Sequence, residues 1–204
     1  MKGIFTLAAA LLACLPLLGP AQTACAGEWT PETVAALKTQ AEAGNAEAQY
    51  SLGMLHDEGE GVPQDYAEAR RWLEKAALQG HAEAQCNLGI LYYKGQGVRQ
   101  NYAEARRWLE KAAAQGLAVA QYNLGVMYHG GQSVRQNYAE ARRWFEKAAA
   151  QGDADAQFNL GAMYLNGDGV RQDKKTAKEW LGKACDNGCQ SGCDEYRKLN
   201  EAGF

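Results

Sequence analysis

A unit of 36 residues recurs four times along this chain of 204 residues. One row of tryptophans and two rows of glycines keep this interval: Trp72, Trp108, Trp144 and Trp180; Gly53, Gly89, Gly125 and Gly161; and Gly80, Gly116, Gly152 and Gly188. Residues 81–116 and 117–152 agree at 27 of 36 positions. A fixed period of this length indicates stacked units that each contact only their neighbours. We therefore expect a solenoid in place of a single closed core.

Each unit is predicted to contain two helices. The second helix, residues 102–115 in the second unit, consists of strong helix formers, with Asn101 as its N-cap and Gly116 as the left-handed residue that ends it. The first helix, residues 82–92, contains Gly89, where a glycine costs about 1 kcal/mol relative to alanine. Because all four units have glycine at this position, we expect the two helices to cross there too closely for a Cβ atom.

The residues at the repeated positions resemble those of a known family. The pattern A-x-A-Q-x-N-L-G-x-x-Y, then G-x-G-V-x-Q-[ND]-Y-x-x-A, then W-x-x-K-A-A-x-Q-G is similar to the Sel1-like repeat, a relative of the tetratricopeptide repeat. It is carried by residues 45–80, 81–116, 117–152 and 153–188. The resemblance implies an all-α fold, a right-handed α-solenoid of antiparallel helix pairs, with capping helices in residues 27–44 and 189–204. The third unit departs from the pattern at Ser133, which replaces a loop glycine.

Residues 1–26 have the layout of a secretory signal peptide. Lys2 precedes an apolar run over residues 3–18, and the small residues 24–26 offer a cleavage site. The run is shorter than the roughly 20 residues of a membrane-spanning helix, so we expect an exported, periplasmic or secreted protein with no transmembrane segment. The alternative is a lipoprotein signal in which Cys14 becomes the lipid-bearing residue. An oxidising compartment would permit disulfides.

The remaining cysteines fall into two groups. Cys86 takes a slot that holds an aromatic residue in the other units, and we expect it to be a buried apolar residue. Cys185, Cys189 and Cys193 form a C-x3-C-x3-C cluster near the end of the fourth unit. Similarity to the secreted cysteine-rich branch of the family implies a disulfide between Cys185 and Cys193. A Cys185–Cys189 bridge and a three-thiolate metal site remain as alternatives.

The sequence contains no recognisable catalytic or cofactor motif. Its three histidines are dispersed, and H-E-x-x-H, G-x-S-x-G and Walker motifs are absent, so we expect no catalytic residue, cofactor or metal. A formal charge of −3 leaves no basic surplus for nucleic acid. The family resemblance carries an alternative, penicillin binding or weak β-lactamase activity, although the S-x-x-K, S-D-N and K-T-G motifs of such serine enzymes are missing.

Two sets of first-helix residues are predicted to contact a ligand. Asp57, Tyr93 and His129 occupy one repeat position with unrelated chemistry, which indicates freedom to select a partner. By analogy with tetratricopeptide grooves, the recurring asparagines are candidates for peptide contacts, namely Asn87, Asn123 and Asn159. The competing hypothesis is that each asparagine bridges two neighbouring helices. We expect a monomeric, non-enzymatic scaffold that binds a protein or peptide on its concave first-helix surface.

Overall fold

The computed structural model describes residues 29–132 and 135–204. This part of the chain consists of ten helices and contains no strand. The helices are α1 (Pro31–Glu42), α2 (Ala46–Glu58), α3 (Tyr66–Leu78), α4 (Ala82–Lys94), α5 (Tyr102–Ala114), α6 (Ala118–Gly130), α7 (Tyr138–Ala149), α8 (Ala154–Asn166), α9 (Lys174–Asp186) and α10 (Gln190–Glu201). The predicted signal peptide, the Cys14 alternative and Ser133 lie outside the described residues.

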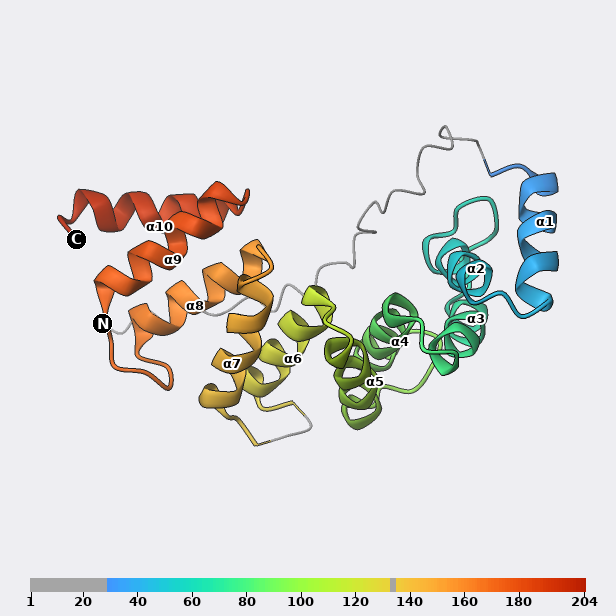
Figure 1. Ribbon diagram of the computed structural model, residues 1–204, viewed down its shortest axis with the longest axis horizontal. Coiled ribbons are helices and arrows are strands. Elements are labelled where there is room, and N and C mark those ends of the chain that lie inside the picture. Colours follow the sequence, from blue (N-terminus) through green and yellow to red (C-terminus); the bar gives the residue numbers. More distant parts are fainter. Residues whose placement is uncertain (1–28, 133–134) are drawn as a thin grey trace.

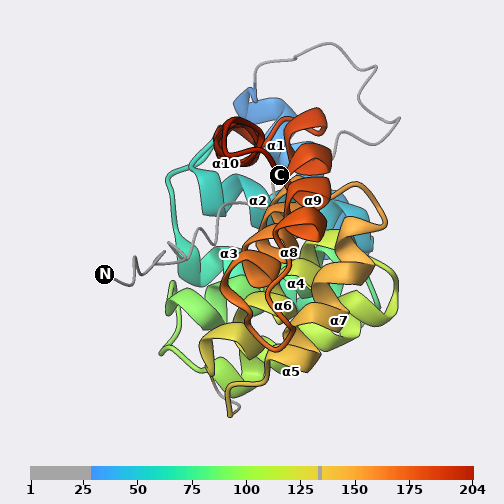
Figure 2. The same cartoon turned by 90° about the vertical axis from the view of Figure 1, so that its left-hand side faces the viewer.

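Each helix packs chiefly on the helices before and after it in the sequence, which confirms the predicted all-α solenoid. The four units are the pairs α2 and α3, α4 and α5, α6 and α7, and α8 and α9. Figures 1 and 2 show that the array bends into an arch, with α1 and α10 at its two raised ends and α5 to α7 at its middle. In Figure 1, α2 and α4 lie on the inner side of the arch and α3 and α5 on its outer side. In the described part of the chain, no helix is both long and apolar enough to cross a membrane.

The ends of the helices follow the capping chemistry of the sequence. The Asn101 side chain accepts hydrogen bonds from the N–H groups of Ala103 and Glu104, at 3.0 and 3.2 Å. Gly116 follows the C-cap of α5 with a φ of 93°, in the left-handed region that a glycine adopts without strain. Both predicted boundaries of this helix are confirmed.

Close approach of the two helices in each unit explains the row of internal glycines. A Cβ built on Gly89 would lie 2.9 Å from Cγ of Leu109, and one built on Gly125 would lie 2.5 Å from the ring of Phe145. Both partner side chains are almost fully buried. In α10 the same repeat position holds Arg197, so this helix does not offer the small-residue surface on which a second helix packs.

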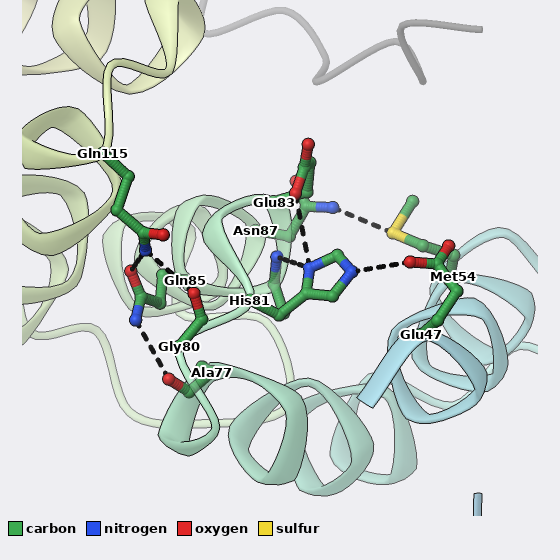
Figure 3. A network of polar contacts seen from close by, with 10 residues as sticks. Glu47, Met54, Ala77, Gly80, His81, Glu83, Gln85, Asn87 and Gln115 are labelled. Atoms are coloured by element: carbon green, nitrogen blue, oxygen red, sulfur yellow. Dashed lines mark hydrogen bonds and ion pairs between the residues drawn. The ribbon is translucent and has the colours of Figure 1, made fainter. Parts of the chain in front are cut away.

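A ladder of amide pairs, each with one buried member on a first helix, joins each unit to the helix before it (Figure 3). Gln85 donates from Nε2 to the carbonyl oxygen of Ala77 at 3.0 Å. Gln115 donates from Nε2 to Oε1 of Gln85 and to the carbonyl oxygen of Gly80, both at 2.9 Å. The equivalent pairs are Gln49 with Gln79, Gln121 with Gln151, and Gln157 with Asn187. Each pair ties a unit to the end of the preceding helix.

Replacing one rung of this ladder is expected to destabilise the chain. Gln85→Met keeps the length of the side chain but removes the donor to Ala77 and the acceptor for Gln115. Because two hydrogen bonds that tie α4 to its neighbours are then lost, we expect the free energy of unfolding to fall by about 1–2 kcal/mol in urea titrations. Gln40→Met, at an exposed position of α1, is the matched control and should change it by less than about 0.5 kcal/mol. Equal effects of the two substitutions would contradict a role for the ladder.

The cysteine cluster forms the disulfide that the family resemblance implies. Cys185 and Cys193 are bonded, with their Cα atoms 4.5 Å apart, and the bond joins the end of α9 to α10. The alternative Cys185–Cys189 bridge and the three-thiolate site are therefore excluded. Cys189 is half-buried at the N-cap of α10, where burial raises the pKa of its thiol. Cys86 is fully buried in the core, as predicted.

Candidate functional site

Four positions in each first helix point away from the second helix of the same unit. They occur at i, i+4, i+7 and i+11, which share one helix face, and they lie opposite the glycine that packs against the second helix, such as Gly53 against Leu73. We call them the inner stripe: Glu47, Ser51, Met54 and Glu58 of α2; Glu83, Asn87, Ile90 and Lys94 of α4; Val119, Asn123, Val126 and Gly130 of α6; and Asp155, Asn159, Ala162 and Asn166 of α8. The inner stripe follows the inner side of the arch.

The chemistry of the inner stripe changes along each helix. At the first position α2, α4 and α8 carry exposed carboxylates, which the positive end of the helix dipole favours. The third position is apolar and half-buried in all four units, with Met54, Ile90, Val126 and Ala162. The fourth position is exposed and differs from unit to unit, with Glu58, Lys94, Gly130 and Asn166. The units thus present different side chains on nearly identical backbones.

The three asparagines predicted to contact a peptide are buried in this stripe. Asn87 is 8% exposed and donates from Nδ2 to Sδ of Met54 in the preceding unit, at 2.9 Å. Asn123 is 3% exposed and donates to the carbonyl oxygen of Val119 at 2.9 Å. Asn159 is 4% exposed and hydrogen-bonds the side chain of Tyr122 in the preceding unit. Two of the three asparagines therefore connect neighbouring first helices, which supports the bridging role over the peptide-contact role.

The other predicted set, Asp57, Tyr93 and His129, lies on a different face of the first helices. Tyr93 is buried, and its ring centroid lies 5.0 Å from that of Tyr102 at the start of α5. The ring of His129 lies 5.0 Å from that of Tyr138, at the start of α7. The structure places Tyr93 and His129 apart from the inner stripe, because a position four residues after the crossing glycine points back toward the second helix. Asp57, at the same position of α2, is coupled by charge to the stripe residue Lys94.

Two members of this set carry electrostatic interactions of their own. Nε2 of His129 lies 3.6 Å from the carboxylate of Asp168. Burial raises the pKa of the Asp57 carboxyl, and the charge of Lys94 partly offsets this shift. Variation at this repeat position therefore accompanies ring packing on the second helix in two units and polar contacts with the following unit.

His81 makes the most connected polar junction on the inner side, between the first and second units (Figure 3). Its Nδ1 accepts a hydrogen bond from the N–H of Ala84 at 3.3 Å and so caps α4. The proton then sits on Nε2, which donates to the carboxylate of Glu47 at 3.0 Å. The Glu83 carboxylate lies 3.4 Å from Nδ1, and the imidazole stacks on Tyr50 with ring centroids 4.6 Å apart. The ring thus holds one stripe carboxylate, that of Glu47, by a hydrogen bond.

Tyr122 holds the same repeat position in α6 as Tyr50 in α2. Its burial gives a pH-dependent prediction. It is 8% exposed, and burial, with a smaller contribution from Asp155, raises its pKa from 10.0 to about 12. The folded chain therefore keeps the phenol protonated at a pH where the unfolded chain releases the proton. The stabilisation is complete below pH 10 and is lost as the pH rises toward 12.

We expect Tyr122→Phe to remove this alkaline sensitivity. Between pH 9 and 12 the variant should lose about 1–3 kcal/mol less unfolding free energy than the unaltered chain, as measured by urea titration at each pH. Tyr196→Phe, at an exposed tyrosine of α10, is the control and should leave the pH profile unchanged. Identical alkaline profiles for Tyr122→Phe and the unaltered chain would contradict the prediction.

The chemistry available at the inner stripe is that of a contact surface. Its polar groups are carboxylates, amides, one hydroxyl group and one ammonium group, distributed over four helices. Residues 29–132 and 135–204 contain no group of three or more histidines, cysteines or acids placed to hold a metal ion. The first stripe position was not predicted from the sequence. The signal that could have revealed it is the recurring A-E-A or A-D-A at the start of the first helix, which changes to A-V-A in α6.

Comparison with known proteins places this arrangement among repeat proteins. The family profile described as Sel1 repeat matches residues 46–81, 82–117, 118–153 and 154–189. A protective antigen of uropathogenic Escherichia coli strains that displays an SLR fold is 41% identical, with a TM-score of 0.80 over 84% of this chain and 37% of that chain. A Sel1 repeat protein from Oxalobacter formigenes is 36% identical, with a TM-score of 0.69 over 80% of this chain and 61% of that chain.

A third similar structure is more distant. Cysteine rich protein B of Helicobacter pylori is 25% identical, with a TM-score of 0.50 over 61% of this chain and 95% of that chain. No curated protein sequence matched the chain. The chain spans well under half of the length of the Escherichia coli protein and about three fifths of the length of the Oxalobacter protein.

Proposed function

The chain belongs to the Sel1 repeat family, and from this we propose that it is an exported, monomeric scaffold that binds a segment of another protein along the inner stripe. The observation that carries the proposal is the contrast between a nearly invariant framework and a variable exposed stripe. Glycine crossings and the amide ladder recur in every unit, whereas the exposed fourth stripe position runs through Glu58, Lys94, Gly130 and Asn166. Arrays of this kind present extended surfaces to other proteins.

The exported location is supported by separate features. The Cys185–Cys193 disulfide is stable in an oxidising compartment such as the periplasm or the extracellular space. The signal-peptide layout of residues 1–26 supports the same location. Within the proposed function we assign Asn87 and Asn159 to bridging the first helices and Asn123 to a buried hydrogen bond within α6.

Selection of random 12-residue peptides displayed on phage tests the proposal. The full chain is the bait, and each selected peptide is then measured against two variants. The inner variant Glu58→Lys/Lys94→Glu exchanges two exposed stripe charges and keeps the net charge, whereas the outer variant Arg107→Ala alters an exposed side chain of α5. We expect the inner variant to lose at least tenfold in affinity and the outer variant to bind normally. Selected peptides that bind both variants equally, or a selection that enriches no peptide, would overturn the proposal.

A further inference from the structure

The first helix of the third unit breaks a rule that the other three units obey. In α2, α4 and α8 the N-cap side chain accepts a hydrogen bond from the helix, at 2.9, 3.3 and 2.7 Å, and an acid follows in the first turn. In α6 the N-cap is Leu117, which makes no side-chain cap bond, and Val119 takes the place of the acid. Both changes remove groups that stabilise the start of a helix. Breaks of a local rule within an otherwise consistent repeat are typical of functional positions.

The break creates an apolar region at the middle of the inner stripe. Leu117 and Val119 are half-buried, and both pack against the core cluster that contains Cys86 and Leu124. Ile90 and Val126, from the third stripe position, are also half-buried. We call Ile90, Leu117, Val119 and Val126 the central band. The helix α6 that carries most of it has no acidic or basic side chain other than His129.

Carboxylates flank the central band on both neighbouring helices. Glu83 lies at the first stripe position of α4 and Asp155 at that of α8, and both are exposed. Neighbouring first helices meet through their side chains, as Asn159 meets Tyr122, which corresponds to axes about 10 Å apart, and an extended peptide advances about 3.3 Å per residue. A strand crossing the first helices therefore reaches each carboxylate about three residues from the side chain that it places on the central band.

We propose that the central band binds an extended peptide segment in which an apolar residue is flanked by a basic residue three positions to either side. This inference rests on the proposed function and specifies its partner. The apolar side chain covers Val119 and Leu117, while the two cations pair with Glu83 and Asp155. Charge complementarity and the uncharged surface of α6 together define this partner, and acidic segments are repelled at both flanks.

Two synthetic peptides and two variants test the inference by fluorescence anisotropy. The probes are fluorescein-labelled Gly-Lys-Ser-Gly-Leu-Gly-Ser-Lys-Gly and the same peptide with glutamate in place of both lysines. Val119→Glu restores the acid of the other units, so it should keep or raise the melting temperature while it weakens the lysine peptide at least tenfold. Leu78→Glu, which adds the same charge to an apolar side chain 71% exposed on α3, is the matched control and should not change binding.

The expected results are at least tenfold tighter binding of the lysine peptide than of the glutamate peptide, and weaker binding at high salt. Equal binding of the two peptides, or unchanged binding by Val119→Glu, would overturn the inference. A melting temperature lowered by Val119→Glu with no loss of binding would assign the central band to packing alone. If phage-selected peptides require the inner stripe but carry no basic flanks, the inference fails while the proposed function stands.

Discussion

Phe145→Ala is expected to lower the free energy of unfolding by about 3–5 kcal/mol, because it empties the centre of the third unit. The Phe145 side chain has no exposed surface and fills the space beside Gly125, where a Cβ would lie 2.5 Å from its ring. Its ring centroid also lies 5.9 Å from that of Tyr122. The cavity left by the substitution would therefore open between α6, α7 and α8.

The location of this loss is as informative as its size. Since units of a solenoid contact only their neighbours, hydrogen exchange should accelerate in α6 to α8 while α2 and α3 keep most of their protection. Phe145→Leu is the control, because the other units hold leucine at this position, and it should cost less than about 1.5 kcal/mol. Uniform acceleration of exchange along the whole chain would contradict a core divided among repeating units.

Removal of the disulfide is expected to release the last helix. The bond closes a loop with a sequence separation of eight residues, for which the chain-entropy relation gives about 2.6 kcal/mol. The helix α10 has only Gly192 and Leu199 buried, and no helix follows it in the described chain. The loss of the bond therefore falls on an element with little other packing.

The variant Cys185→Ser/Cys193→Ser should show fast amide exchange in α10 and the last turn of α9, with protection in α2 to α5 unchanged. Cys189→Ser is the matched control, because that thiol lies between the two bonded cysteines and is not part of the bridge. It should leave exchange in α10 as in the unaltered chain. Equal protection of α10 with and without the bridge would contradict its role as a staple.

The sequence predicted those parts of the fold that depend on period and local chemistry. The caps at Asn101 and Gly116 and the close crossing at Gly89 follow from residue types that few other environments favour. The amide ladder was not predicted, because its members are 30 or 35 residues apart and glutamines near helix ends usually face water. Packing of α4 against the end of α5 brings Gln85 and Gln115 together, and stacking on the preceding unit brings both to its last carbonyl groups, those of Ala77 and Gly80.

The candidate site was less predictable, because variability between units has more than one cause. Tyr93 and His129 differ between units, yet they pack on Tyr102 and Tyr138 of the second helices. Counting 100° per residue from the crossing glycine places Tyr93 and His129 on a different helix face from the inner stripe. The sequence positions alone could therefore have separated the two faces. The burial of Asn123 was beyond a single-helix argument, because it depends on how closely neighbouring helices pack around that position.

A methyl NMR titration of the full chain with a phage-selected peptide tests the central claim most directly. The claim is that a partner segment lies along the inner stripe, where the third position provides a methyl group in every unit. The predicted result is a progressive shift of the methyl signals of Met54, Ile90, Val126 and Ala162, with Leu78 on α3 unchanged. Shifts confined to the second helices, with the inner-stripe methyl signals unmoved, would contradict it.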